Sequence, residues 1–593
     1  CGFAYDDDNV GRDDNWIHAV EPFDRTIALP FAPESAASGI GETGYHPIVW
    51  YRRELGRQDL AAGGLGLQGD RIILHFGAVD HTSDVWVDGT HVVRHVGGQT
   101  AFSIDVTHAL IGDHHVIVVR AQDDPLDAIL PRGKQDWHAE PHAIWYHRST
   151  GIWRSVWLEA VVAVHVTHLA WTPDLVHAAV GLELELSARP AAGESLTIEL
   201  SHEGTALSRI SLDVHSDRIR LDVPIAALRN GQAIDELTWS PTHPRLIDAR
   251  LSLSSGDAVN SYVGLRSVRV EAGRLLLNDR PFSLRSVLQQ GYWPTSHFTA
   301  PSVDAMREEI ELTKRLGFNS IRIHQKVEDP RYLYWCDRLG LTVWAEAAAA
   351  YEFSPRAIEL YASEWLRIVR SQQSHPSIIV WVPFNESWGI QHVSHDPAQA
   401  AYSRSLADLT RALDPSRPVV ANDGWEHTGS DLVTIHDYEG NGDVLRDRYG
   451  SAESIQALLA GIGPHGRRMV ASNSVQVNPP IMLTEFGGVR YETGQAQAGG
   501  WGYSSAATAD KFEQQLRAVV GAIHSSPHVV GFCYTQLTDT EQEVNGLCDA
   551  NRVPKLPEET IRAIMEGAEL RSPIPTSTTS TLPKLPGQKG PMS

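Results

Sequence analysis

The sequence predicts a multidomain protein in which two β-sandwich domains precede an α/β barrel. The chain has 593 residues, too many for a single hydrophobic core. Short runs of alternating apolar and polar residues fill the first part, and strand-like and helix-like segments alternate in the rest. We predict a jelly-roll, sugar-binding-like β-sandwich over 1–160, an immunoglobulin-like β-sandwich over 161–268, a (β/α)8 TIM barrel over 269–572, and a Ser/Thr/Pro-rich tail over 573–593.

The first sandwich is predicted from short strand-like runs that are separated by turn residues such as Asp88-Gly89 and Gly97-Gly98. No useful length of helical periodicity interrupts them, and strands at this spacing are typical of a sandwich or jelly roll. The runs are VWYRREL (49–55), RIILHFGAV (71–79), SDVWVDG (83–89), HHVIVVRAQ (114–122) and RSVWLEAV (154–161).

The second sandwich continues the same pattern, with runs such as VGLELELSA (180–188) and SLTIELSH (195–202). Six or seven alternating strands in about a hundred residues suit an immunoglobulin-like sandwich. The segment contains no cysteine pair, so we expect it to lack the disulfide of antibody domains.

The barrel is predicted from a change of period after residue 268. Helical spacing appears in SVDAMREEIELTKRLG (302–317), where Ser302 is a plausible N-cap, and in PRAIELYASEWLRIVRSQQ (355–373). We expect the long insertion 441–479 to lie over the active face of the barrel. Eight strands are expected to begin near 282, 318, 341, 377, 418, 432, 481 and 528.

Composition and charge exclude several classes of protein. The formal net charge of −23 argues against nucleic acid or an anionic membrane as a partner. No apolar run is long enough to span a membrane. The four cysteines form no CxxC pair, so we expect neither a disulfide framework nor a zinc site. We expect a cytoplasmic protein, with secretion or a lipidated Cys1 as alternatives, and no cofactor.

Two buried strand-like runs each end in a glutamate. SIIVWVPFNESWG (377–389) delivers Glu386, and PIMLTEFGG (480–488) delivers Glu485. Strand ends of a barrel converge on one pocket, so the two carboxyl groups are expected to face each other. Cleavage of a glycosidic bond needs one carboxyl to protonate the leaving oxygen and a second to attack the anomeric carbon or activate water. The pair therefore predicts glycoside hydrolysis.

These motifs resemble those of glycoside hydrolase family 2. NESWG (385–389), TEFGG (484–488) and the order of the predicted domains are all similar to that family, and the resemblance covers residues 1 to about 570. Further similar pieces are FDRTIALPFAPES (23–35), HPIVWYRREL (46–55), HFGAVDHTSDVWVDG (75–89), STGIWRSVWLE (149–159) and DRLGLTVWAE (337–346). The resemblance implies a retaining exo-glycosidase with Glu386 as acid/base, Glu485 as nucleophile and Asn385 as ligand of the sugar 2-hydroxyl.

Other polar residues at predicted strand ends are candidates for substrate binding. Arg322 is expected to lower the pKa of the nucleophile, or to form an ordinary ion pair at the barrel mouth. His324 ends the same strand, and Glu346 either binds substrate hydroxyls or pairs with an arginine. Of His436 and Tyr438, the resemblance favours Tyr438 as the residue that contacts the nucleophile.

Aromatic residues and one region of the first domain complete the candidates. Trp388, Trp425, Trp501 and Tyr534 are candidates for stacking on sugar faces, with core or rim packing as the alternative. Asp80 and Asp84, in VDHTSD, resemble a part of the family that leans toward the barrel pocket.

The sugar is less well defined by the sequence. No Asn-x-Lys follows Glu485, which makes a glucuronidase less favoured by resemblance. We expect a galacto- or arabino-configured carbohydrate substrate, as for a β-galactosidase, with β-D-galactofuranosidase, α-L-arabinofuranosidase or α-L-arabinopyranosidase activity as alternatives. A transglycosylase and a catalytically silent carbohydrate-binding protein are further alternatives. A homo-oligomer is possible by analogy.

Overall fold

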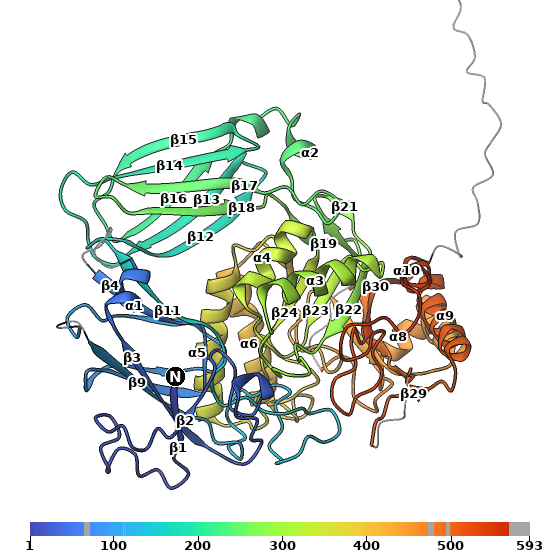
Figure 1. Ribbon diagram of the computed structural model, residues 1–593. Coiled ribbons are helices and arrows are strands. Elements are labelled where there is room, and N and C mark those ends of the chain that lie inside the picture. The colour runs from blue at the N-terminus through green and yellow to red at the C-terminus, as the bar shows by residue number, and fades with distance from the viewer. Residues whose placement is uncertain (65–70, 111, 113, 472–478, 494–498, 568–593) are drawn as a thin grey trace, which may run out of the picture.

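The computed structural model describes residues 1–64, 71–110, 112, 114–471, 479–493 and 499–567. The predicted tail over 573–593 lies outside these residues. In Figure 1 the two β-sandwiches lie on the left, one above the other, and the helix-lined parallel sheet lies beside them. The predicted fold class is confirmed: a multidomain, β-rich chain with a TIM-like parallel sheet in its C-terminal half.

The first sandwich packs a six-stranded antiparallel sheet against a three-stranded sheet. The strand orders are β2-β1-β3-β9-β6-β7 and β11-β4-β8, and β10 pairs separately with β5. Val49, Leu74 and Val119 belong to the apolar cluster between the sheets. The elements are β1 (Gly2–Tyr5), β2 (Arg25–Thr26), η1 (Ala36–Ser38), β3 (Ile48–Leu55), α1 (Arg57–Ala62), β4 (Arg71–Phe76), β5 (Val79–Asp80), β6 (Thr82–Val87), β7 (Thr90–Val96), β8 (Phe102–Asp105), β9 (His115–Gln122), β10 (Gly151–Ile152) and β11 (Val156–Val161).

The second sandwich contains seven strands in sheets of three and four. The orders are β12-β13-β16 and β15-β14-β17-β18, and alternate residues of β13 and β14 point into one apolar cluster. The elements are β12 (Val166–Asp174), β13 (Ala179–Leu186), β14 (Ser195–His202), β15 (Thr205–Asp213), β16 (Arg218–Pro224), η2 (Ala226–Leu228), α2 (Ile234–Leu237), β17 (Ile247–Leu253) and β18 (Ala258–Val263).

The C-terminal half is built on a parallel sheet of seven strands in the order β25-β24-β23-β22-β30-β27-β26. Its strands are buried on both faces, as parallel strands are. A short antiparallel sheet, β19-β20-β21, precedes it. Its apolar residues form one buried cluster with apolar residues of the parallel strands. The strands are β19 (Val268–Glu271), β20 (Arg274–Leu277), β21 (Arg280–Pro281), β22 (Leu284–Gln289), β23 (Ser320–Ile323), β24 (Thr342–Glu346), β25 (Ile378–Val382), β26 (Val433–Asp437), β27 (Ile481–Gly487), β28 (Val489–Arg490), β29 (Ser504–Ser505) and β30 (Val529–Thr535).

The strand expected near 418 does not form a regular ladder. The segment touches its neighbour only through two parallel bridges, Trp381 to Val419 and Asn385 to Asp423. Side chains take the place of ladder partners, because the backbone N–H of Val419 donates to Asp431 Oδ2 at 2.7 Å and that of Ala421 donates to Ser430 Oγ at 2.9 Å. The eighth strand position is therefore filled by an extended segment that side chains hold in place.

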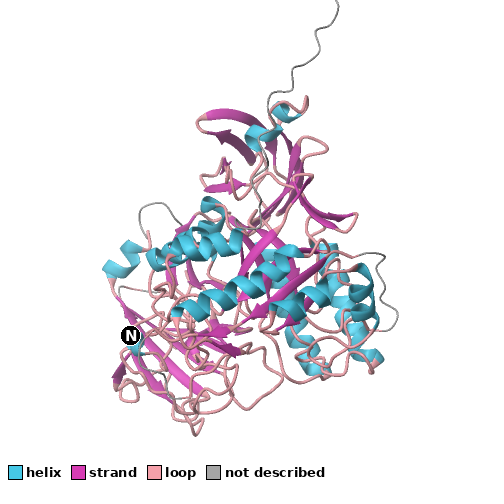
Figure 2. Ribbon diagram, turned by 90° about the vertical axis from the view of Figure 1, so that its right-hand side faces the viewer, coloured by secondary structure: helices cyan, strands magenta, loops and turns pink. Residues whose placement is uncertain are grey.

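Helices follow most of the strands and cover the sheet (Figure 2). The predicted cap at Ser302 is present, since its Oγ accepts the N–H of Ala305 at 3.0 Å. Ser354 caps the next long helix in the same way. The helices are α3 (Val303–Arg315), α4 (Pro330–Leu339), α5 (Pro355–Gln372), α6 (Pro397–Leu413), α7 (Gly442–Tyr449), α8 (Ala452–Ala460), α9 (Ala509–Ser525) and α10 (Glu558–Glu566).

The two helices of the insertion 441–479 lie away from the active face, which the whole insertion was expected to cover. Its first helix, α7, packs against α9 in the outer layer, and α8 lies near the starts of β26 and β27. Leu445 and Tyr449 of α7 and Ile455 of α8 are buried in the apolar cluster of the domain, which holds these helices to the side of the sheet. Of the described part of the insertion, His465 contacts aromatic residues at the ends of the strands.

The loop between β9 and β10, residues 123–150, connects the first sandwich to the barrel. The backbone N–H groups of Arg132 and Gly133 both donate to the carbonyl of Ala349, at 3.1 and 3.0 Å. Tyr351 donates its hydroxyl to the carbonyl of Gly133 at 2.7 Å. The loop therefore lies against the residues that follow β24, and Figure 1 shows it running beneath the sheet.

All four cysteines are free thiols, and Cys336, Cys533 and Cys548 are buried. In the part of the chain that the structure describes, no helix combines the length and the apolar character needed to cross a membrane.

Candidate active site

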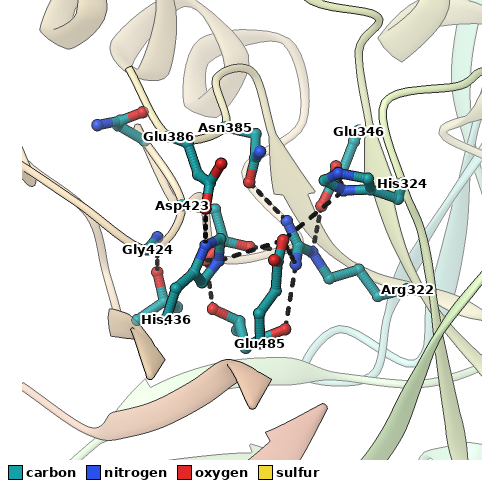
Figure 3. A network of polar contacts seen from close by, with 12 residues as sticks. Arg322, His324, Glu346, Asn385, Glu386, Asp423, Gly424, His436 and Glu485 are labelled. Atoms are coloured by element: carbon teal, nitrogen blue, oxygen red, sulfur yellow. Dashed lines mark hydrogen bonds and ion pairs between the residues drawn. The ribbon is translucent and has the colours of Figure 1, made fainter. Parts of the chain in front are cut away.

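The polar side chains of the candidate site stand at the C-terminal ends of neighbouring parallel strands. Arg322 is the last residue but one of β23, and Glu346 ends β24. His436 lies near the end of β26, and Glu485 lies in β27. Glu386 follows shortly after β25. Because parallel barrel strands all end at one face, these residues from distant parts of the sequence point toward one another (Figure 3).

Arg322 is the centre of this network and is completely buried. Its Nη1 donates to Glu485 Oε1 at 2.7 Å, and its Nη2 donates to Asn385 Oδ1 at 2.7 Å. Its Nε donates to Glu346 and lies 3.1 Å from Asp423 Oδ2. A buried guanidinium with partners for its donors fixes the positions of several acceptors at once. The interpretation of Arg322 as a residue that steers the Glu485 carboxylate agrees with these contacts.

Glu485 is held in its ionised form. Burial alone would raise its pKa, but the positive charges of His436, Arg322 and His324 outweigh burial and keep that pKa well below the usual range. The hydroxyl of Tyr438 donates to its other oxygen, Oε2. The sequence preference for Tyr438 as the tyrosine against this carboxylate therefore agrees with the geometry.

His436 lies between the two glutamates. Its Nδ1 is 2.7 Å from Glu386 Oε1, and its Nε2 is 3.5 Å from Glu485 Oε1 and 3.6 Å from Asp423 Oδ1. Burial lowers the pKa of this histidine, but the carboxylates of Glu485, Asp423 and Glu386 outweigh it and raise the pKa to about 10. At neutral pH His436 is therefore a cation that lies between the two glutamates.

The backbone at Glu386 is unusual and is fixed by its neighbours. Glu386 and Ser387 have left-handed φ values of 50° and 57°, which cost free energy for non-glycine residues. The N–H of Glu386 donates to the carbonyl of Asp423, and that of Ser387 donates to Asn422 Oδ1, both at 2.9 Å. As a result, one carboxyl oxygen of Glu386 lies within 4.8 Å of one of Glu485.

His324 and Glu346 form a polar wall beside the pair of glutamates. His324 Nδ1 is 3.0 Å from Glu346 Oε2 and 4.0 Å from Glu485 Oε1. The backbone N–H of Gln325 also donates to Glu346 Oε2 at 3.0 Å. Asn385 Nδ2 is buried and has no partner among the described residues, so it is free to donate to a ligand hydroxyl.

Aromatic side chains flank Glu386 on one side. Trp388 lies 5.1 Å from Tyr351 and 5.8 Å from Trp145, measured between ring centroids. Trp145 comes from the loop of the first sandwich, and its Nε1 donates to the Tyr351 hydroxyl at 2.7 Å. This edge of the site is therefore built jointly by the barrel and the first domain.

A second aromatic group lies beside the nucleophile candidate. Tyr438 stacks on Tyr503 with a centroid distance of 3.3 Å, and Trp501 meets Tyr503 edge to face. His465 contacts both Tyr438 and Trp425. Trp388, Trp425 and Trp501 are thus partly exposed near the candidate site, and their contact with a sugar stays a prediction.

Two expectations for site residues need correction. Tyr534 is fully buried in the apolar cluster between sheet and helices, against Gly487, and presents no ring face to a ligand. Asp80 accepts a hydrogen bond from Gln135 Nε2 at 2.9 Å inside the first domain. Asp84 pairs with arginines of the same domain. These carboxylates are bound by first-domain partners, so they support that domain instead of lining the pocket.

Sequence reasoning missed Asp423 and Tyr503. Asp423 lies between Arg322 and His436, and their charges keep its pKa well below the usual range although burial alone would raise it. Its position in the predicted strand PVVANDGW was a signal that could have identified it. Tyr503 follows a segment without regular periodicity, and nothing in the sequence indicated its stacking on Tyr438.

Among the described residues, three groups of side chains each bring three possible metal-ligand atoms within 4.8 Å of one another. We assign no metal to any of them, because the third is the acid network described above and in the first the oxygens of Asp136 already accept backbone N–H groups. The groups are Asp136 with His138 and His142, His147 with His297 and Glu541, and Glu386 with His436 and Glu485.

Comparisons with known proteins agree with this fold. The family described as "Glycosyl hydrolases family 2, TIM barrel domain" matches residues 268–439. The chain is 25% identical to a β-galactosidase of Thermoanaerobacter pseudethanolicus over 395 residues, which covers 64% of this chain and 49% of that one. It is 26% identical to a putative β-glucuronidase of Formosa agariphila over 402 residues, covering 65% and 46%. The match thus spans about half the length of these relatives.

Solved structures show the same architecture over nearly the whole chain. A family 2 β-galacturonidase from Eisenbergiella tayi bound to galacturonate has a TM-score of 0.70 at 21% identity, covering 91% of this chain and 92% of that one. A β-glucuronidase from Ruminococcus gnavus in complex with D-glucuronic acid has a TM-score of 0.73 at 17% identity, covering 95% and 96%.

Fold and site together define a multidomain barrel protein with a pair of carboxylates at the C-terminal ends of its strands. The barrel family and the relatives narrow this class further. Residues 268–439 match the barrel domain of glycoside hydrolase family 2, and the chain is similar to β-galactosidases and β-glucuronidases.

Proposed function

We propose that the protein is a retaining exo-glycosidase, with Glu485 as nucleophile and Glu386 as acid/base. One observation carries the proposal: carboxyl oxygens of the two residues lie within 4.8 Å of each other. Retaining enzymes place their carboxyl groups about 5 Å apart, whereas inverting enzymes leave room for a water at roughly 6.5–9.5 Å. The short distance favours retention.

In the first step the ionised Glu485 attacks the anomeric carbon while Glu386 gives its proton to the leaving oxygen. Arg322 and His436 favour this arrangement, because they hold Glu485 as an anion before substrate arrives. The glycosidic bond breaks, a glycosyl ester forms on Glu485, and the aglycone leaves as an alcohol.

In the second step Glu386, now a carboxylate, removes a proton from water. The oxygen of that water attacks the anomeric carbon, the ester bond to Glu485 breaks, and the sugar leaves with its original anomeric configuration. A hydroxyl of a second sugar in place of water would give transglycosylation. We propose hydrolysis as the main outcome, and product analysis with acceptor sugars distinguishes the two.

The substrate we propose is a terminal β-glycoside with a galacto- or arabino-configured sugar. Asn385 Nδ2 and the Nε1 atoms of Trp388 and Trp425 are buried donors without partners among the described residues, as expected of a site that binds hydroxyl groups. The relatives are named as β-galactosidases and β-glucuronidases. An acidic sugar is therefore a second candidate, and a lysine at the barrel mouth favours it, as argued below.

The first test replaces the nucleophile. We expect Glu485→Gln to lower kcat by at least about three orders of magnitude, which is the scale of loss when a catalytic nucleophile is removed. Hydrolysis of 4-nitrophenyl glycosides measures the effect, with a panel that includes β-galactopyranoside, β-galactofuranoside and α-L-arabinopyranoside. Glu513→Gln, a change on the outer helix α9, is the matched control and should keep full activity.

The stereochemistry of the released sugar is the second readout. NMR of the first product should show the anomeric configuration of the substrate. Near-normal turnover in Glu485→Gln, or release of the opposite anomer, would contradict the proposal. Tight sugar binding without turnover in the wild type would instead support a catalytically silent binding protein.

A further inference from the structure

Lys134 is a buried lysine whose ammonium has no partner among the described residues. The residue is only 7% exposed, and its Nζ makes neither a hydrogen bond nor an ion pair in that part of the chain. Two other buried lysines behave differently: Lys326 Nζ lies 3.0 Å from Glu328 Oε2, and Lys555 Nζ lies 2.6 Å from Asp539 Oδ1. A buried, unneutralised ammonium is costly unless a ligand pairs with it.

The neighbours of Lys134 place it at the mouth of the barrel. The preceding residue, Gly133, donates to the carbonyl of Ala349, just after Glu346 at the end of β24. A side chain at Gly133 would collide with the carbonyl of Gln325, just after β23. Lys134 thus follows a backbone segment that is pressed against the strand ends that carry the candidate site.

The opposite side of Lys134 is the loop after β30. The carbonyl of Lys134 accepts the N–H of Tyr146 at 2.9 Å, and the Tyr146 hydroxyl donates to Glu543. The ammonium is close enough to lower the pKa of Glu543, although burial raises that pKa overall. The charge of Glu485 acts on Glu543 in the opposite direction and raises its pKa.

Glu543 does not neutralise Lys134 by direct contact. Its Oε1 accepts from Asn545 Nδ2 at 3.2 Å and its Oε2 accepts from Tyr146. Among the described residues the ammonium is not part of any ion pair. Its nitrogen is also not one of the fully buried side-chain atoms that lack a hydrogen-bond partner, so part of its surface is exposed. It is therefore available to an anion that binds at this end of the barrel.

We propose that Lys134 binds the carboxylate of a terminal uronic acid, so that the substrate is an acidic glycoside. This inference rests on the proposed glycosidase function and, of its two substrate candidates, selects the acidic sugar. Neutral hydroxyl groups already have candidate ligands in Asn385, Glu346 and His324. An ionised carboxylate forms a charge-assisted hydrogen bond with the ammonium and removes the uncompensated charge, which a hydroxyl group does not.

This role of Lys134 could not be predicted from the sequence. A uronide is disfavoured there because no Asn-x-Lys follows Glu485. Lys134 comes from the first domain, in the loop between β9 and β10, and reaches the site only through the docking of that loop on the barrel. A motif search near the nucleophile cannot detect a cation supplied by another domain.

The test compares uronides with their neutral counterparts. We would measure kcat/KM for the 4-nitrophenyl pairs β-galacturonide and β-galactoside, and β-glucuronide and β-glucoside. The wild type should prefer one of the uronides to its neutral partner. Lys134→Met should lower kcat/KM on that uronide by about 10- to 100-fold, the scale of a lost hydrogen bond to a charged group, with a change of less than about threefold on the neutral sugar.

Two further variants serve as controls. Lys134→Arg keeps the charge and should retain part of the preference for the uronide. Lys511→Met removes an exposed lysine from α9 and should match the wild type. Circular dichroism and the thermal transition show whether Lys134→Met is folded. A wild type that prefers the neutral sugars, or a Lys134→Met variant that loses all substrates equally, would overturn the proposal.

A binding measurement separates this inference from the proposed function. Calorimetry with galacturonate, glucuronate, galactose and glucose needs no turnover. Tighter binding of one uronate that Lys134→Met abolishes would uphold the role of Lys134, even if the wild type hydrolysed nothing and the glycosidase proposal failed. Hydrolysis of neutral glycosides without preferential uronate binding would reject Lys134 alone.

Discussion

His436 is the residue whose positive charge interacts with both glutamates. It lies 2.7 Å from Glu386 Oε1 and 3.5 Å from Glu485 Oε1. Nearby carboxylates outweigh burial and raise its pKa to about 10, and its charge in turn lowers the pKa of Glu485. Loss of this cation should therefore make the nucleophile easier to protonate.

We predict that His436→Gln moves the acidic limb of the kcat/KM profile to higher pH. The sign follows because removal of a nearby positive charge destabilises the Glu485 carboxylate and raises its pKa, by about one to two units for a close charge. The pH dependence of kcat/KM for the best glycoside measures this, since it reports groups of the free enzyme. His395→Gln, at an exposed position, should leave the limb unchanged. An acidic limb that stays in place in His436→Gln would contradict the role given to this cation.

At the scale of one element, strand β27 fixes the nucleophile candidate. All seven residues from Ile481 to Gly487 are buried. Gly487 ends the strand with a left-handed φ of 84°, and a side chain there would collide with the ring of Tyr534. Tyr534 thus supports the strand from behind, which explains why it is buried and not in the pocket.

We predict that Gly487→Ala reduces both stability and activity. The substitution combines backbone strain of about 1–2 kcal/mol with displacement of Tyr534 or of the strand. Gly193→Ala is the matched control, since Gly193 has a φ of 89° but nothing within 4 Å of the added methyl group. Thermal unfolding and kcat/KM compare the two variants. Equal, small losses in both would mean that the contact with Tyr534 is unimportant.

At the scale of the whole molecule, the contact between the first domain and the barrel places Trp145 and Lys134 at the site. Glu364 of α5 takes part in this contact, because its Oε1 accepts the N–H of Gln99 at 2.7 Å. Gln99 Oε1 in turn accepts the N–H of Val327, near the end of β23. Burial raises the pKa of Glu364 to about 7.

This raised pKa gives a stability prediction with a definite sign. The folded protein binds the proton of Glu364 more tightly than the unfolded chain does, so the contribution of this group to stability falls as pH rises from about 4.5 to about 7. The full effect is about 3 kcal/mol, from the difference between these two pKa values. Glu364→Gln should match the wild type near pH 5 and unfold at a higher temperature above pH 7.

Melting curves of both proteins across this pH range test the prediction. Gln keeps an acceptor for the N–H of Gln99, so the variant removes only the titrating group. Glu359→Gln changes an exposed carboxylate on the same helix and serves as control. A constant difference in melting temperature at all pH values would indicate that Glu364 does not titrate in this range.

Much of the fold could be predicted from the sequence because it is encoded locally. The alternating runs identify the sandwich strands, and the caps and helical spacing identify helices such as α3 and α5. The expected strand at 418–425 was less predictable, because side chains such as Asp431 and Ser430 replace the ladder hydrogen bonds there. The position of the insertion 441–479 depends on packing against α9, which is a contact between segments distant in sequence.

For the site, the sequence by itself determined which carboxylates stand at strand ends. Glu386 and Glu485 end buried apolar runs, and the convergence of parallel strands brings such ends together. The tertiary structure alone decided the charges and partners around them: the His436 cation, the position of Asp423, the stacking of Tyr503 on Tyr438 and the arrival of Lys134 from another domain. These features depend on distances between segments that are far apart in the chain, and a pKa is set by such distances and by burial, which no local pattern encodes.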